Sequence, residues 1–153
     1  MPAASEPTAR PPLPQTFRPL GVRMAIYVAG GLLLLVVLVT WFAFPPEIRD
    51  MFTFGQRVTV VGLGLMFYAA GHALSRSRVV ARESGLTVVN GYRTRRFEWN
   101  EVLAVQLRSG SPWAILDLSD GTSVPAMGIQ GSDGPRAMQQ VREVRALVAR
   151  LTR

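Results

Sequence analysis

The sequence predicts an α+β protein. A two-helix transmembrane hairpin precedes a small antiparallel β half-barrel, which a C-terminal amphipathic helix closes. Two long runs without charged residues lie in the first half of the chain, and short β-rich segments separated by turn sequences follow them. The last segment changes to helical periodicity. We therefore expect a Pro-rich cytoplasmic tail over residues 1–20, a membrane hairpin over residues 21–75 and a cytoplasmic domain over residues 76–153.

The amino-acid composition excludes several classes of function. The chain has 153 residues, 17 basic against 10 acidic side chains, a net charge of +7, one His and no Cys. Without Cys, disulfides, thiol catalysis and Cys-ligated metal centres are excluded. Only 18% of the residues are charged and 48% are hydrophobic, which fits a soluble nucleic-acid binder poorly. We expect no nucleic-acid partner.

The polar residues do not form a catalytic pattern. No base–nucleophile pairing, metal-ligand spacing or phosphate loop can be placed on the sequence. His72 lies near the end of the second uncharged run, close to Arg76, where a wetted interfacial side chain is favoured over a proton relay. We therefore expect a protein that is not an enzyme, with no catalytic residue, no cofactor and no metal site.

The tail, residues 1–20, is rich in Pro, Ala, Ser and Thr and contains six of the 11 prolines. Proline removes backbone donors and fixes φ, and little in this segment can form a core. We expect the tail to be disordered. A P-x-x-P match over residues 11–14 is explained by composition alone.

The first uncharged run covers residues 24–44 and spans about 30 Å as a helix, which is the thickness of a bilayer core. A cleaved signal peptide is the alternative. However, the run exceeds the usual hydrophobic region of such peptides, no small-x-small site precedes Pro45, and a second apolar run follows. We expect a transmembrane helix that ends at Pro45 and Pro46.

The second uncharged run, residues 58–74, is close to the lower length limit for a membrane span. Arg57 and Arg76 at its ends can snorkel and lengthen it. A buried core helix is the alternative, but the first run lies only 13 residues away, which favours a helical hairpin.

Small residues recur in both runs and are candidates for close helix packing, with ordinary composition as the alternative. The candidate helix-packing residues are Gly30, Gly31, Gly62, Gly64 and Gly71.

Arginines flank the hairpin unevenly. Three precede the first run and three follow the second closely, whereas the loop between the runs carries two. The positive-inside rule then places both termini in the cytoplasm. We expect a multi-pass protein of the inner (plasma) membrane.

Short segments of the C-terminal half have the composition and alternation of strands. Asn90 before Gly91, and Asp120 before Gly121, are strong hairpin signals. The expected strands cover residues 79–82, 86–89, 94–99, 102–108, 113–118 and 122–126. Alternation within the fourth of these predicts one apolar face, formed by Leu103, Val105 and Leu107.

A helix is expected over residues 135–151, with Asp133 as its cap and Pro135 in its first turn. Apolar residues at helical spacing predict a buried stripe. The stripe consists of Met138, Val141, Val144, Val148 and Leu151.

The run SGLTVVNGYRTRRFEW over residues 84–99, followed by NEVLAV over residues 100–105, resembles the bacterial PH domain family. It is most similar to the small two-span, membrane-anchored type of high-GC Gram-positive bacteria, called low-molecular-weight antigen 6-like. The resemblance covers about residues 77–150. It implies a membrane-tethered PH-like half-barrel and no catalytic residues. PH domains that hold phosphoinositides carry a basic motif in the first hairpin loop. Here Ser84 and Gly85 form that turn, so specific headgroup binding is not expected.

Six arginines after the second run and in the following hairpin are candidate contacts for lipid or a partner. A cation near an anionic leaflet contributes about 1 kcal/mol. The alternative is a topology signal plus a solvated strand face. The six are Arg76, Arg78, Arg82, Arg93, Arg95 and Arg96.

Together these features predict a membrane-anchored, PH-like interaction module at the cytoplasmic face. It would bind a protein partner or act as an accessory subunit of a membrane complex. The alternative is a module that responds to anionic lipid through the Arg-rich hairpin. The expected partners are membrane lipids and a membrane or cytoplasmic protein.

Overall fold

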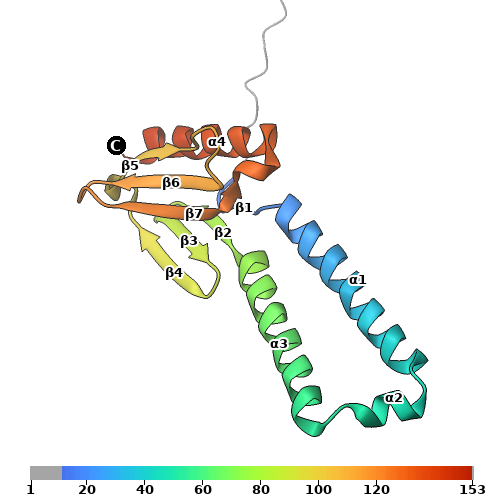
Figure 1. The fold of residues 1–153 in the computed structure, drawn as a ribbon. Coiled ribbons are helices and arrows are strands. Elements are labelled where there is room, and N and C mark those ends of the chain that lie inside the picture. The colour runs from blue at the N-terminus through green and yellow to red at the C-terminus, as the bar shows by residue number, and fades with distance from the viewer. Residues whose placement is uncertain (1–11, 153) are drawn as a thin grey trace, which may run out of the picture.

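The computed structural model describes residues 12–152 and has an α+β domain from which two long helices extend (Figure 1). The helices are α1 (Gly21–Ala43) and α3 (Phe54–Arg76), and the short α2 (Pro46–Met51) joins their far ends. Both long helices are long and apolar enough to cross a membrane. The first eleven residues of the predicted tail lie outside the described part of the chain.

Capping groups set where the second long helix begins. The Thr53 hydroxyl accepts a hydrogen bond from the Gln56 N–H at 3.3 Å, and the Gln56 side-chain oxygen accepts one from the Thr53 N–H at 2.9 Å. This reciprocal pair satisfies two N–H groups at the start of α3. The helix therefore starts four residues before the uncharged run at residues 58–74. The Thr53 cap, and not the last charged residue before the run, determines where the helix begins.

The domain contains two antiparallel sheets, and the expected α+β class is confirmed, although the sheets do not close into a barrel. The first sheet has the order β1 (Gln15–Phe17), β2 (Arg78–Arg82), β3 (Gly85–Asn90), β4 (Arg93–Phe97). The second has the order β5 (Val102–Gln106), β6 (Trp113–Leu118), β7 (Ser123–Gln130). Two 3-10 turns, η1 (Trp99–Glu101) and η2 (Gly131–Asp133), and the helix α4 (Pro135–Leu151) complete the domain.

Strand β1 differs from the disorder expected over residues 1–20. Its three residues pair with β2 through Gln15–Ala81, Thr16–Val80 and Phe17–Val79, and Phe17 is only 4% exposed. The tail lacks strand periodicity, but the edge of β2 supplies backbone partners and the core supplies a site for one aromatic ring. A segment before α1 thus belongs to the same sheet as segments that follow α3.

The core lies between the two sheets and under α4, where apolar side chains from all three layers are buried. Strands β2 and β3 lie against β7. This approach is so close that a Cβ on Gly128 would lie 2.5 Å from the Arg78 backbone. Gly128 therefore sets the distance between the two sheets.

The stripe of α4 is rotated relative to the expected one. Val141 and Val144 are buried as predicted, whereas Met138 is 45% exposed. Val148 and Leu151 are partly buried against the core, and Ala137, Gln140 and Leu147, which were not predicted, are buried as well. The sheets approach α4 from a direction that the spacing of its large apolar residues does not specify.

The apolar face expected within residues 102–108 is wrong in part. A register shift between Val102 and Ala104 places Val102 and Val105 in the core and leaves Leu103 65% exposed. A β-bulge inserts one residue into the alternation, and this reverses the face of the residues before it.

Candidate interaction site

The β3–β4 turn rests on the end of α3. The Tyr92 hydroxyl donates to the carbonyl of Ala69 at 3.1 Å and lies 3.2 Å from His72 Nδ1. The Arg76 guanidinium lies 5.5 Å from the centre of the Tyr92 ring, a cation–π distance. The Gly91 N–H donates to the Ser77 hydroxyl at 3.0 Å. His72, which the sequence placed at a wetted interface, is thus a contact between helix and domain.

The same turn is tied to the second sheet by Asn90. Its side-chain amide donates to the carbonyl of Pro125 at 2.5 Å, and its oxygen accepts from the Met127 N–H at 3.0 Å. The Asn90 side chain therefore fixes the base of the hairpin to β7, while Gly91 and Tyr92 fix its turn to the end of α3. The Asn-Gly pair was predicted as a turn signal only, and these contacts were not foreseen.

A second contact holds the domain to α1. The Asp133 carboxylate accepts from the N–H groups of Leu20 and Gly21 at 2.9 and 2.8 Å. A carboxylate stabilises a helix N-terminus through its free N–H groups and the helix dipole. Asp133 was expected to cap the C-terminal helix. It instead serves α1, and Gly134 is the N-cap of α4.

The six candidate arginines do not form one cluster. Arg76 and Arg78 lie where α3 meets the sheet, and Arg93 begins β4 next to the anchored turn. Arg82 ends β2 opposite Gly85, at the other end of the sheet. The structure thus separates Arg82 from Arg76 and Arg78, because β2 leads the chain away from α3.

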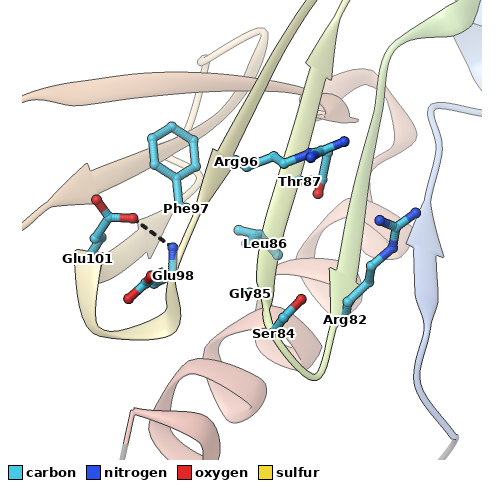
Figure 2. Close-up of a pocket in the computed structure, with 9 residues that line it drawn as sticks. All are labelled: Arg82, Ser84, Gly85, Leu86, Thr87, Arg96, Phe97, Glu98 and Glu101. Carbon is cyan, nitrogen blue, oxygen red and sulfur yellow. Dashed lines mark hydrogen bonds between the residues drawn. The ribbon is translucent and has the colours of Figure 1, made fainter.

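At that distal end, Arg82 and Arg96 rim a pocket of about 340 Å³ (Figure 2). Glu98 and Glu101 line its opposite side, and the Glu98 N–H donates to the Glu101 carboxylate at 2.7 Å. Two cations facing two carboxylates give the pocket no net charge, so it does not select an anion by charge. The full lining is Arg82, Ser84, Gly85, Leu86, Thr87, Arg96, Phe97, Glu98 and Glu101.

Strand β4 is the most exposed strand of the first sheet. Its first four residues are exposed and only Phe97 is partly buried. Within residues 12–152, β4 pairs with β3 alone, so its other edge is open. The side chains of Arg93, Arg95 and Arg96 on this strand make no hydrogen bond or ion pair with another described residue.

Comparison with known proteins places this arrangement in a family. A family model described as "Bacterial PH domain" matches residues 76–147. The uncharacterized protein Rv1417 of Mycobacterium tuberculosis is 36% identical over 124 residues, covering 81% of this chain and 75% of the relative. The chain belongs to the bacterial PH domain family. The uncharacterized protein Mb1452 of Mycobacterium bovis gives the same identity and coverage. No solved structure matches the chain.

Outside the PH domain, four of the five candidate packing glycines do not bring α1 and α3 together. Apart from its chain neighbours and the backbone of its own helix, a Cβ on Gly30, Gly31, Gly62 or Gly64 would meet no described atom within 4 Å. Gly71 does lie at a close contact, 3.0 Å from the Ile26 side chain for an added Cβ. Figure 1 shows the two helices separating toward α2, because the PH domain holds their near ends and α2 spaces their far ends.

Proposed function

We propose that the chain is a membrane-anchored interaction module whose PH domain binds a protein partner at the cytoplasmic face. The observation that carries this proposal is the attachment of the domain to both long helices through Tyr92 and Asp133. These contacts hold one sheet edge in a fixed place beside the membrane. A domain that is only tethered to the membrane would not need these contacts with the helices.

The state of the long helices supports insertion in a bilayer. The domain buries none of the most apolar stretch of either helix. Large side chains such as Leu32, Phe67 and Tyr68 are between 63% and 70% exposed. A soluble protein does not leave apolar surface of this extent in water. In a bilayer these side chains contact lipid, which removes the free-energy cost of exposing them to water.

The sheet supports the proposed topology. Strand β1 precedes α1 and β2 follows α3, so both ends of the helical pair meet in one sheet. Two membrane crossings return the chain to the side from which it started. The arginine bias around the helices assigns that side to the cytoplasm.

The open glycine positions support a lateral partner for the helices. Gly30 and Gly31 on α1, and Gly62 and Gly64 on α3, leave room for the backbone of another transmembrane helix. This is the arrangement expected of an accessory subunit in a membrane complex.

The test is photo-crosslinking of the full-length chain in its own cells, followed by purification in mild detergent. A crosslinking residue is placed at exposed positions on the domain (Thr94, Leu103, Ala146) and on α3 (Leu65). We expect discrete protein products that require irradiation, with phenylalanine at the same positions as the control. A chain that purifies alone and gives no protein product from any position would overturn the proposal.

Recognition of anionic lipid is the competing function. The position of Arg76, Arg78 and Arg93 beside the end of α3 favours it, since this end would lie near the headgroups if α3 spans the bilayer. It predicts that hydrogen exchange of β4 slows in nanodiscs of anionic lipid relative to neutral lipid, and that salt reverses the change. The variant Arg93→Ala/Arg95→Ala/Arg96→Ala should lose the difference. Equal exchange in both lipids at low salt would remove this alternative.

A further inference from the structure

We propose that the open edge of β4 accepts an acidic, extended segment of a partner protein as a fifth strand of the first sheet. This inference rests on the proposed function and specifies the surface and the chemistry of the partner. Adding a strand to a free sheet edge is an established mode of peptide recognition, in which main-chain hydrogen bonds supply the affinity.

The backbone of β4 is oriented for this role. Its hairpin with β3 has a two-residue turn, and Asn90 pairs with Arg93. In such a hairpin the residues that close the turn are hydrogen bonded to each other, and the pattern then alternates. Arg93, Arg95 and Phe97 therefore direct their backbone groups toward β3. The N–H groups of Thr94 and Arg96 point to the open edge.

The two edges of the sheet differ in what is available. The β2 edge is occupied by β1, which comes from the chain's own tail. The β4 edge is free in the described chain because the following turn, Trp99–Glu101, sends the chain into the second sheet. A five-residue strand offers an edge of about 17 Å.

Charge selects the occupant. Arg93 and Arg95 lie on one face of β4 and Arg96 on the other, and all three are exposed. A second copy of β4 would place arginine beside arginine, which disfavours self-association through this edge. A strand with acidic residues at two alternate positions would face Arg93 and Arg95 without repulsion.

The ends of the edge limit where the acidic residues fall. At one end, Tyr92 is bonded to α3, so the edge starts near the proposed membrane interface. At the other end, Glu98 and Glu101 would repel an acidic side chain. The occupant is therefore an acidic juxtamembrane segment whose carboxylates lie at the membrane-proximal half of β4.

The chain offers a way to test this with a tethered probe. The Thr152 hydroxyl donates to the carbonyl of Trp99 at 3.2 Å, so the C-terminus of α4 ends close to the distal end of β4. A Gly/Ser linker of about eight residues after Arg153 reaches the edge. It presents the segment Thr-Val-Glu-Val-Glu-Thr at high effective concentration. The matched control carries Lys in place of both Glu residues.

The readout is hydrogen exchange of the Thr94 and Arg96 amides in the full-length fusion, reconstituted in neutral-lipid nanodiscs. With the acidic segment we expect about tenfold slower exchange at these two amides, and no slowing with the Lys segment. Thr94→Pro removes one outward N–H at a position an edge strand tolerates, and should abolish the protection, whereas Thr94→Ala should keep it. Arg93→Glu/Arg95→Glu should also abolish it, whereas Arg142→Glu/Arg150→Glu, equal in charge and exposed on α4, should not.

Unchanged exchange with the acidic segment, or equal protection by the Lys segment, would overturn the inference. The cellular crosslinks separate its failure from that of the proposed function. Protein products at Leu103 or Ala146 but none at Thr94 would support the proposed interaction module and would reject the β4 edge as its binding surface. A lipid product at Thr94 rejects the edge in favour of lipid recognition. A protein product at Thr94 that maps to an acidic segment supports it.

Discussion

The two ends of the PH domain are built from different kinds of contact. At the end next to α1 and α3, hydrogen bonds join residues far apart in the chain, such as Asp133 to Leu20 and Asn90 to Met127. At the distal end the turns are local, as where Asp120 binds Thr122 two residues away. The long-range bonds of the distal end, from Trp99 to Arg82 and from Thr152 to Trp99, stay within the domain. The difference teaches that long-range contacts at the first end fix the domain on its helices, whereas the tip of the β6–β7 hairpin depends on short-range turn chemistry. The following substitutions test that comparison.

The largest effect is expected for Phe17→Ala. Phe17 is buried in the core by a strand that precedes α1, so its loss leaves a cavity and weakens β1. The expected loss is about 3 kcal/mol in the free energy of unfolding, measured by Trp fluorescence during denaturation in detergent. Thr16→Ala, an exposed neighbour on the same strand, is the control. Equal effects of the two changes would mean that β1 is not part of the folded core.

Asn90→Ala should cost about 2 kcal/mol, because it removes two hydrogen bonds and leaves the carbonyl of Pro125 and the N–H of Met127 unpaired. The same unfolding measurement applies, and exposed Asn100→Ala is the comparison. Hydrogen exchange should also accelerate in both β3 and β7. A change confined to the β3–β4 turn would show that Asn90 acts as a turn residue only.

Asp133→Ala should destabilise the chain by about 1 kcal/mol through the start of α1. Faster exchange of the Leu20 and Gly21 amides is the specific readout. Asp133→Asn keeps acceptor capacity for one of the two N–H groups and should fall between wild type and the alanine variant. If exchange in Asp133→Ala instead accelerates at the start of α4, the carboxylate caps the helix that follows it and not α1.

The smallest effect belongs to the distal end. The backbone N–H and then the hydroxyl of Thr122 lower the pKa of Asp120 below its ordinary value. A lowered carboxyl pKa contributes stability above the unfolded pKa, and this contribution is lost as the pH falls through the folded value. Thr122→Val should therefore raise the Asp120 pKa and reduce stability slightly near neutral pH. The difference from wild type should vanish once the pH lies below the folded-state pKa of Asp120, where the carboxyl is protonated in both proteins.

Carboxyl NMR titration measures the Asp120 pKa directly in both proteins. An unchanged pKa in Thr122→Val would assign the whole shift to the backbone N–H. A stability difference that persists at low pH would assign it to packing of the Thr122 side chain. Either result would change which part of Thr122 stabilises the turn.

Features carried by neighbours in sequence could be predicted from the sequence. The uncharged runs lie almost entirely within α1 and α3, the Asn90–Gly91 and Asp120–Gly121 signals lie at the turns, and the closing helix has the predicted bounds. The family followed from the same segments. The candidate arginines were found as residue types, but their separation into two ends of the sheet depends on strand register, which was not predicted.

By itself, the sequence determined the two apolar helices, the run of hairpins and the C-terminal helix, since hydrophobic period and turn chemistry act over a few residues. Only the tertiary structure decided that the tail supplies β1, that Asp133 binds the start of α1, and that a bulge turns Leu103 outward. It also left the Arg-rich edge of β4 open in the described chain. Each of these depends on partners tens of residues away, whose approach no local pattern records.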